Sequence, residues 1–295
     1  MSKKPIRKAI VAVAGSGTRL LPATKSMPKE MLPIVDKPAI QLIVEELVAA
    51  GIEDIILVTK WDKKPLEDHF DRSWALESDL EKAGKEEKLQ EVRRIADLAN
   101  FIYVRQKGPY GNGTPLLSAA SLVDDEPFVY AFGDDLVKSK TSFTKQMVEE
   151  YEKYQTPIVG VQRVSPDEVH KYGIVELKEG TNEMKSIVEK PEPQNAPSQL
   201  AQFGRFILDQ DIINSLRETS LGKGNELWLT DAIERYLLSG KIVRVKEIMD
   251  GKWLTTGDPL SYVMANLEYA MDRDDLRIPI EKFIQKQIHN REKGR

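Results

Sequence analysis

The sequence predicts an α/β fold in which a mixed, mainly parallel sheet is flanked by helices. Strand-like runs alternate with helix-like runs along most of the chain, a pattern that is typical of βαβ units. The 295 residues are 41% hydrophobic, so they can bury a sizeable core. The segment from about Ser165 to Pro193 differs, because short β-like pieces alternate there with turn residues. This segment predicts a small antiparallel lobe beside the sheet.

The predicted strands are short apolar runs bounded by turn residues. The first, Lys8–Ala14, reads "KAIVAVA", and the run Pro127–Asp135 is a buried strand that ends in two acids. The other predicted strands are 54–60, 101–106, 156–164, 172–177, 184–191, 202–209 and 241–248. Two of these, 172–177 and 184–191, make up the antiparallel lobe.

The predicted helices follow from a repeat of about 3.6 residues and from end signals. In the segment 36–51, Pro38 suits the first turn and Gly51 suits the end. Apolar residues share one face of the segments 36–51 and 225–238: Ile40, Ile43, Leu47 and Val48 in the first, and Leu229, Ile233 and Leu237 in the second. The other helices are expected at 63–70, 75–98, 111–123, 143–154 and over most of the chain from 259 onward. We expect this last region to pack on the core or on a second subunit.

The bulk composition excludes several classes of protein. A formal net charge of −4 provides no overall basic field for nucleic acid. Without cysteine there is no disulfide and no thiolate metal site, so we expect a cytoplasmic setting. The apolar run after the basic start is too short for a signal peptide, and no run approaches the ~20 apolar residues of a membrane span. We therefore expect neither nucleic acid nor a membrane as a partner.

A long loop, "GSGTRLLPATKSMPKEMLP", follows the first strand over residues 15–33. Glycines after a strand let backbone N–H groups approach an anion. The dinucleotide fingerprint G-x-G-x-x-G fails because Leu20 replaces its third glycine, and no Walker A motif is present. Three cations, Arg19, Lys25 and Lys29, lie in a segment that prolines stiffen, and such a set suits a polyphosphate. Composition alone leaves a basic surface loop as an equal alternative.

The segment "GSGTRLLPATKSMPKEMLPIVDKP" resembles the signature of the sugar-nucleotide pyrophosphorylases, a family of sugar nucleotidyltransferases. Further motifs follow in the family's order: "IEDIILVT", "VRQ", "GDD", "YGIVE", "VEKP", "APSQLA", "GRFIL", "GNELWLTDAI" and a final "W…TG…Y". Within the family, the chain most resembles the bacterial members that join UTP and glucose 1-phosphate.

The resemblance implies a Rossmann-like nucleotidyltransferase fold with the antiparallel lobe on its sugar side. We expect a single domain over 1–295, with a nucleotide-binding core at about 1–164 and a sugar-binding part at about 165–258. The C-terminal helices would occupy about 259–295. The family also implies a homodimer or homotetramer.

The reaction that this resemblance implies is the Mg²⁺-dependent in-line attack of a glucose 1-phosphate oxygen on the α-phosphorus of UTP. Its products are UDP-glucose and pyrophosphate. A phosphate nucleophile is mostly ionised at neutral pH, because its second pKa is ~6, so no general base is required. None of the 3 histidines lies in a motif. Catalysis would then depend on positioning and charge neutralisation.

The resemblance also assigns the site residues. Arg19 and Lys29 are expected on the triphosphate, and Lys25 is a weaker candidate. Asp134, as a hard oxygen ligand, is the expected Mg²⁺ site. The expected nucleotide-binding residues are Ala14, Gly15, Gly17, Thr18, Glu30, Gln106 and Gly111. The expected sugar-binding residues are Asp135, Gly173, Glu189 and Lys190, and the catalytic set is Arg19, Lys29, Asp134 and Lys190. A purely structural role is the alternative: a helix cap or a surface turn for Asp134 and Asp135, and a strand-end ion pair for Glu189 with Lys190.

Three positions depart from the family pattern. The loop after Gln106 reads "GNGTP" instead of "GLGHA" or a close relative, and Trp228 stands where the family often has glutamine. Thr255 occupies the place of an aspartate that is often a second metal ligand. A hydroxyl replaces a carboxylate poorly, so a catalytically weak relative that binds sugar nucleotide and regulates a partner enzyme remains an alternative. Preference for another sugar 1-phosphate or nucleotide is also open.

Overall fold

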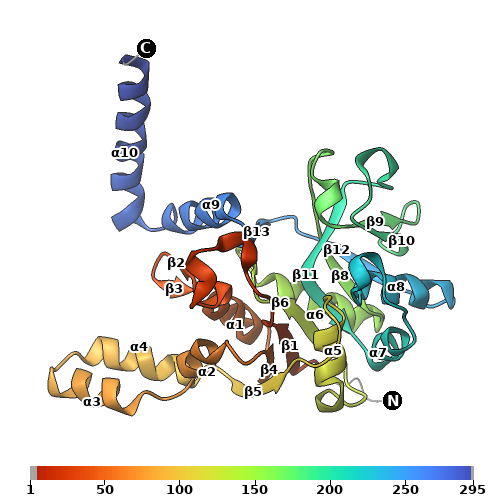
Figure 1. The fold of residues 1–295 in the computed structure, drawn as a ribbon, viewed down its shortest axis with the longest axis horizontal. Coiled ribbons are helices and arrows are strands. Elements are labelled where there is room, and N and C mark those ends of the chain that lie inside the picture. The colour runs from red at the N-terminus through yellow and green to blue at the C-terminus, as the bar shows by residue number, and fades with distance from the viewer. Residues whose placement is uncertain (1–4, 294–295) are drawn as a thin grey trace.

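The computed structural model describes residues 5–293, with backbone only at 292 and 293. A nine-stranded sheet runs through it, made of β1 Lys8–Ala12, β4 Asp54–Thr59, β5 Asn100–Arg105, β6 Phe128–Phe132, β8 Ile158–Arg163, β9 Gly173–Leu177, β10 Met184–Glu189, β11 Leu200–Leu208 and β12 Arg244–Glu247. The main order is β10-β9-β11-β6-β1-β4-β5, and β8 pairs with both β11 and β12 (Figure 1). Every predicted strand is therefore present, and the mixed sheet is confirmed.

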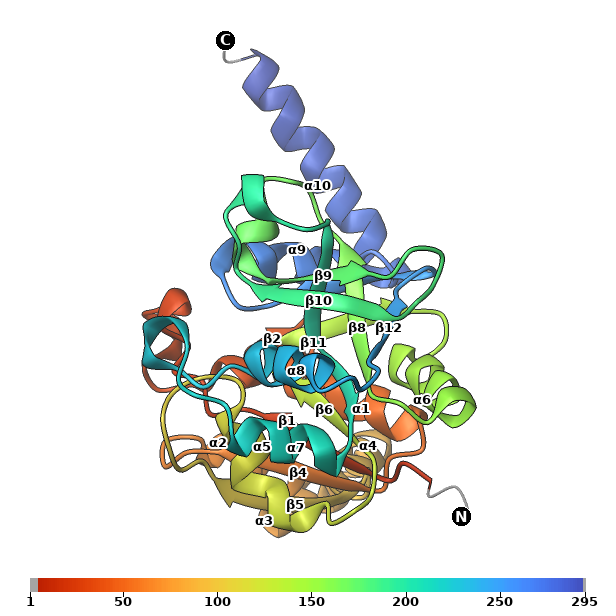
Figure 2. The same ribbon diagram turned by 90° about the vertical axis from the view of Figure 1, so that its right-hand side faces the viewer.

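Helices cover both faces of this sheet. They are α1 Ala39–Ala49, α2 Lys64–Phe70, α3 Trp74–Lys82, α4 Glu86–Ala96, α5 Thr114–Ala119, α6 Phe143–Tyr154, α7 Gln210–Arg217, α8 Leu229–Leu238, α9 Pro259–Ala270 and α10 Asp274–Lys293. One core packs α1, α2 and α6 against the sheet, and the other packs α5, α7 and α8 on the opposite face, which Figure 2 turns toward the viewer. Two apolar layers thus hold the sheet between them.

The alternation of side chains along the central strands explains why both faces are covered. In β1, Ala9 and Val11 belong to one core and Ile10 belongs to the other. Successive side chains of a strand point to opposite faces, so a strand with no polar position must be buried on both. β1 pairs in parallel with β4 and β6, and β4 pairs in parallel with β5. The carboxyl ends of the strands in this half therefore lie at one edge of the sheet.

The other half of the sheet is antiparallel. β11 pairs antiparallel with β6, β8 and β9, and β9 pairs antiparallel with β10. The expected antiparallel lobe is present, and through β11 it continues the central sheet. It stands beside the carboxyl edge of β6, where a ligand bound to the parallel half would meet it.

Several predicted boundaries differ from the structure. The segment 75–98 does not form one helix, because Gly84 at φ +65° separates α3 from α4. Pro38 is not in the first turn of α1; it caps the helix at φ −56° and ψ 143° and pairs in a two-residue strand. The helix predicted from 225 begins only at Leu229, after a loop in which Gly224 has a φ of +72°. α5 is shorter than predicted and continues as a 3-10 turn.

A small sheet beside the cleft was not predicted from the sequence. β7 Asp135–Ser139 pairs antiparallel with β13 Gly251–Thr255, and Thr255 lies opposite Asp135. Asp135 therefore begins a strand and does not end one, because the chain reverses at Gly133 and Asp134 after β6. This pairing brings the end of the chain to the carboxyl edge of the main sheet.

The two C-terminal helices differ in how they contact the body of the molecule. α9 packs beside β13, and α10 projects away as a free arm (Figure 1). The arm carries exposed apolar side chains at Ile278, Phe283, Ile284 and Ile288. We expected this region to pack on the core or on a second subunit. α9 packs on the core, and α10 does not. Within residues 5–293, no helix has the length and hydropathy that a membrane crossing requires.

Candidate active site

Two adjoining cavities lie at the carboxyl edge of β1 and β6. The smaller, of about 300 Å³, is lined by the loop after β1 and by the 106–112 segment. The larger, of about 690 Å³, lies between β6, the antiparallel strands and the start of α9. Asn112, Phe132 and Asp134 line both cavities, so the two form one cleft. Ligands of open α/β sheets bind at such an edge.

The loop after β1 folds as three single 3-10 turns, Thr18–Leu20, Ala23–Lys25 and Lys29–Met31. Gly17 has a φ of +63°, which suits glycine, and the Thr24 hydroxyl donates a 2.7 Å hydrogen bond to its carbonyl oxygen. A Cβ at Gly15 would lie only 3.2 Å from the Lys29 Cε. The glycine therefore lets the lysine stem pass across the backbone and reach the cleft.

Lys29 and Asp134 form an ion pair where the two cavities meet. The Lys29 Nζ donates to the Asp134 Oδ2 over 2.5 Å, and both side chains are mostly buried. Burial by itself would raise the pKa of Asp134, but the charges of Lys29 and Arg19 outweigh it and lower the pKa below its ordinary value. Burial would likewise lower the pKa of Lys29, yet Asp134 and Glu30 raise it. Both groups are therefore charged at neutral pH.

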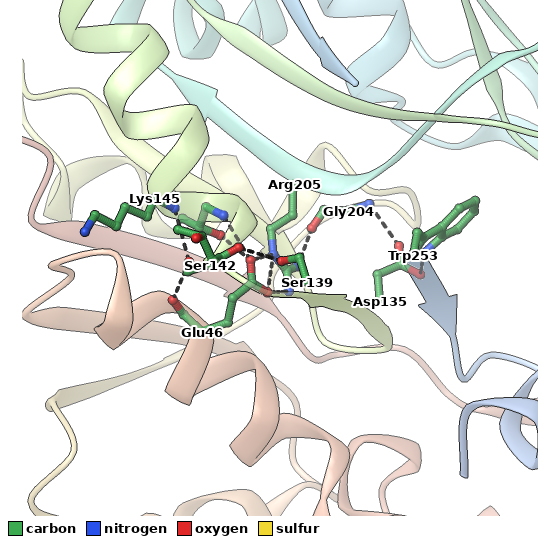
Figure 3. A network of polar contacts seen from close by, with 10 residues as sticks. Glu46, Asp135, Ser139, Ser142, Lys145, Gly204, Arg205 and Trp253 are labelled. Atoms are coloured by element: carbon green, nitrogen blue, oxygen red, sulfur yellow. Dashed lines mark hydrogen bonds and ion pairs between the residues drawn. The ribbon is translucent and has the colours of Figure 1, made fainter. Parts of the chain in front are cut away.

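Asp135 is held by a buried polar network (Figure 3). The Gly204 N–H donates to its Oδ2 and the Trp253 Nε1 donates to its Oδ1, each over 2.9 Å. The next residue, Arg205, is fully buried and pairs with Glu46 of α1 over 2.6 Å. Burial and the neighbouring charge of Asp134 raise the pKa of Asp135 to about 6. Both carboxylate oxygens of Asp135 thus accept hydrogen bonds from the protein, and these bonds hold together the segments that form the floor of the cleft.

Charged and aromatic side chains line the larger cavity. The Lys190 Nζ lies 3.3 Å from the Glu189 Oε1, and the Thr230 hydroxyl donates to the Glu189 Oε2 over 3.1 Å. Burial raises the pKa of Glu189, although Lys190 and Thr230 oppose this effect. The rings of Tyr172 and Phe203 pack on Trp253, at centroid distances of 4.8 Å and 5.4 Å. Aromatic faces beside hydrogen-bonding groups suit a polyhydroxylated ligand.

Comparisons with known proteins agree with this geometry. The family model described as nucleotidyl transferase matches residues 8–272. A UTP–glucose-1-phosphate uridylyltransferase of Bacillus subtilis (strain 168) is 45% identical over 293 residues, which cover 98% of this chain and 99% of the relative. The chain belongs to the nucleotidyl transferase family.

Solved structures show the same likeness. A UTP-bound enzyme from Acinetobacter baumannii matches with a TM-score of 0.86 at 38% identity, covering 95% of this chain and 99% of that one. A UDP-glucose pyrophosphorylase complexed with UDP-glucose matches with a TM-score of 0.80 at 42% identity, covering 91% of this chain and all of that one (100%). The nucleotidyltransferase fold predicted from the sequence is confirmed.

The fold of this nucleotidyl transferase brings most of the predicted site residues to the cleft. Ala14, Gly15, Lys29, Gln106 and Gly111 line the smaller cavity. Arg19, Asp135, Gly173, Glu189 and Lys190 line the larger one, with Asp134 in both. Gly111 is required for packing, because its φ is +122° and a Cβ there would lie 2.2 Å from the Leu227 carbonyl oxygen.

Some predicted residues do not line either cavity. Glu30 is fully buried and bonds Lys63 over 2.6 Å, so its carboxylate supports the loop from beneath. Gly17 and Thr18 form the turn that precedes Arg19. Lys25 lines a separate hollow of about 320 Å³ on the other side of the loop. In the nucleotidyl transferase these four residues thus lie beside the cleft.

Asp134 is the carboxylate of the cleft that could hold a metal ion. Among the described residues, no three histidine, aspartate or glutamate side chains gather to hold a metal ion. Thr255 lines the larger cavity as a neutral hydroxyl, and Asp258 caps α9 by accepting from the Ser261 N–H over 3.0 Å. Mg²⁺ commonly keeps several waters and binds one or two carboxylates together with substrate phosphates. The donor set fits that mode, with a single carboxylate.

The sequence motifs did not identify every cleft residue. Tyr172, Phe203 and Asn112 line the cleft but had no predicted role, and Trp253 was noted only as part of a motif. The positions of the three aromatic residues depend on the pairing of β13 with β7 and of β9 with β11. Asn112 accepts hydrogen bonds from the Leu229 N–H and the Tyr130 hydroxyl. An aromatic residue in a strand gives no signal that separates a core position from a cleft position.

Proposed function

We propose that this chain transfers the uridylyl group of UTP to glucose 1-phosphate, giving UDP-glucose and pyrophosphate. The observation that carries the proposal is the cleft itself, in which Lys29 and Asp134 sit between a smaller and a larger cavity. Relatives named UTP–glucose-1-phosphate uridylyltransferase match nearly the whole chain and support the same assignment.

The nucleotide would occupy the smaller cavity. Gln106 carries both a donor and an acceptor, as recognition of uracil requires, and Gly111 lines the same cavity. The triphosphate would lie along the backbone N–H groups of the loop beside Lys29 and Arg19. These cations neutralise the charge that develops on the leaving pyrophosphate.

The sugar phosphate would occupy the larger cavity. Glu189 accepts from hexose hydroxyls, Lys190 receives the phosphate, and Gly173 and Asp135 border the ring. The attacking oxygen belongs to a phosphate that is already ionised, so the chain has no proton to remove. What this chain provides is alignment of two anions and cancellation of their repulsion.

Mg²⁺ belongs to this proposal, with Asp134 as its protein ligand. When bound, it would neutralise phosphate charge and lower the repulsion between the two substrates. Asp134 supports this role because it lines both cavities and because Lys29 and Arg19 lower its pKa, so that its carboxylate is ionised as a Mg²⁺ ligand must be.

A homodimer or homotetramer and a cytoplasmic location remain predictions of the same proposal. The apolar side chains exposed on α10 support self-association, because water contact with such a row is unfavourable.

The direct test is release of pyrophosphate from UTP, glucose 1-phosphate and Mg²⁺. We expect turnover by the unmodified chain and a loss of about 100-fold or more in kcat for Asp134→Asn. Lys190→Ala should raise KM for glucose 1-phosphate more than KM for UTP. No product at high enzyme concentration would reject the proposal in favour of a binding protein without activity, and a panel of nucleotides and sugar 1-phosphates would reveal another substrate pair.

A further inference from the structure

Trp228 lines two cavities, together with Glu189. On one side is the larger cavity of the cleft, and on the other is a hollow of about 470 Å³ over β10 and α8. The Trp228 ring faces the Lys190 ammonium, whose Nζ lies 4.2 Å from the ring centroid. A cation at this distance over a tryptophan is attracted by the negative face of the ring.

Lys190 needs such a support because little else defines where its ammonium lies. Its side chain is 37% exposed, and it approaches the Glu189 carboxylate to 3.3 Å. Its backbone has a φ of +45°, which turns the chain at the end of β10, and its N–H donates to the Tyr172 carbonyl over 3.0 Å. The main chain is therefore fixed, while the four-carbon stem retains many rotamers.

The Trp228 ring is itself held in place. Its Nε1 donates to the Lys223 carbonyl oxygen over 2.9 Å. The residues on either side of it are tied to the nucleotide side of the cleft: the Leu227 N–H donates to the Tyr110 carbonyl, and the Leu229 N–H donates to the Asn112 Oδ1, each over 2.8 Å. The ring is thus held by its own hydrogen bond, and the backbone that carries it is held by the hydrogen bonds of its two neighbours.

We propose that Trp228 is a positioning residue that holds the Lys190 ammonium ready for the phosphate of the sugar substrate. A second carboxylate could also hold this lysine, but an incoming phosphate would have to displace it. A neutral ring attracts the ammonium and leaves its N–H donors free. The inference rests on the proposed function, since that function places the sugar phosphate at Lys190.

The experiment compares Trp228→Gln and Trp228→Phe with the unmodified chain. Initial rates give kcat, KM for glucose 1-phosphate and KM for UTP, and calorimetry gives the Kd of UDP-glucose without turnover. Loss of the ring should raise KM for glucose 1-phosphate and the Kd of UDP-glucose about 3- to 30-fold, with KM for UTP unchanged. Trp228→Phe should recover most of the loss, because it keeps an aromatic face.

Trp74 provides a matched control. It lies at the start of α3, outside the residues that line the cleft, and the Arg72 guanidinium sits 4.7 Å above its ring. Trp74→Gln removes the same kind of contact and should leave all four constants unchanged. A second comparison places Trp228→Gln in a Lys190→Ala background, where it should have little further effect because its target is gone.

Several outcomes would overturn the inference. Unchanged constants in Trp228→Gln, equal increases of both KM values, or an undiminished effect in the Lys190→Ala background would each show that the ring does not act through Lys190. Absence of turnover and of UDP-glucose binding in the unmodified chain would reject the proposed function, and this inference with it. Turnover by the unmodified chain with an unaffected Trp228→Gln variant would reject the inference alone.

Discussion

At the scale of single residues, the acids at the end of β6 have different surroundings although they are neighbours. Asp134 pairs with Lys29 and faces the cleft, while both oxygens of Asp135 accept hydrogen bonds from the protein. Thr255 lies opposite Asp135 across the β7–β13 pair and adds no charge. The affinity for Mg²⁺ should therefore depend on one carboxylate and on the substrate phosphates.

We predict that Thr255→Asp lowers the Mg²⁺ concentration for half-maximal activity by about tenfold, because it adds a hard oxygen ligand beside Asp134. The measurement is the initial rate as a function of Mg²⁺ at saturating substrates. Thr255→Asn is the control, since it has nearly the same size without the charge. An equal shift in both variants would show that the added carboxylate does not act on the metal.

At the scale of elements, α3 and α4 depend on one acid. Glu77 of α3 is only 3% exposed and accepts from the Arg72 Nε over 2.6 Å and from the Arg93 Nε of α4 over 3.0 Å. These two hydrogen bonds lower the pKa of Glu77 from 4.5 to about 2, and the bond from Arg72 has the larger effect. A carboxyl whose pKa is lower in the folded state stabilises that state when it is ionised.

The lowered pKa of Glu77 makes the stability of α3 and α4 depend on pH. The contribution of Glu77 to the free energy of unfolding is present above about pH 4.5 and is lost as the pH falls toward 2. We predict that Glu77→Gln increases amide exchange in α3 and α4 at pH 7, and that the difference from the unmodified chain shrinks as the pH falls toward 2. Activity should not change. Glu81→Gln, at an exposed position of the same helix, is the control, and a similar effect there would contradict the assignment.

At the scale of the whole molecule, the body and the C-terminal arm have different solvent exposure. The sheet and its helices enclose two apolar cores, whereas α10 projects from the body with Phe283 at 61% and Ile288 at 53% exposure. A single exposed apolar side chain is ordinary, but a row along a projecting helix is typical of a helix that packs on a partner.

We predict that replacing Ile284 and Ile288 together by glutamate reduces self-association without unfolding the body. The two residues are four apart and share a face of α10, so both charges fall on one surface. Analytical ultracentrifugation measures the assembly, and circular dichroism checks the fold. Gln285→Glu with His289→Glu adds the same number of acids one residue along, and it should leave the assembly intact. A change of assembly in both variants would indicate general charge repulsion.

The sequence alone determined the kind of fold and most of the cleft. Mainly apolar runs such as Lys8–Ala12 and Asp54–Thr59 alternate with helix-like runs, and this alternation predicted βαβ units with parallel strands. Since parallel strands end at one edge, the loop with Lys29 and the acid Asp134 were expected together, and they form an ion pair. Residue types and local patterns were enough to predict those parts of the cleft that lie at the ends of neighbouring parallel strands.

Only the tertiary structure decided the rest. Glu30 belongs to the same motif as Lys29, but it points into the protein and pairs with Lys63. Trp253 and Thr255 reach the cleft because β13 pairs with β7, more than 110 positions away, as in the bond from Trp253 to Asp135 with a separation of 118 residues. Trp228 faces Lys190 only because α8 packs on β10. Such contacts depend on free energy summed over distant segments, and no local pattern in the sequence encodes that sum.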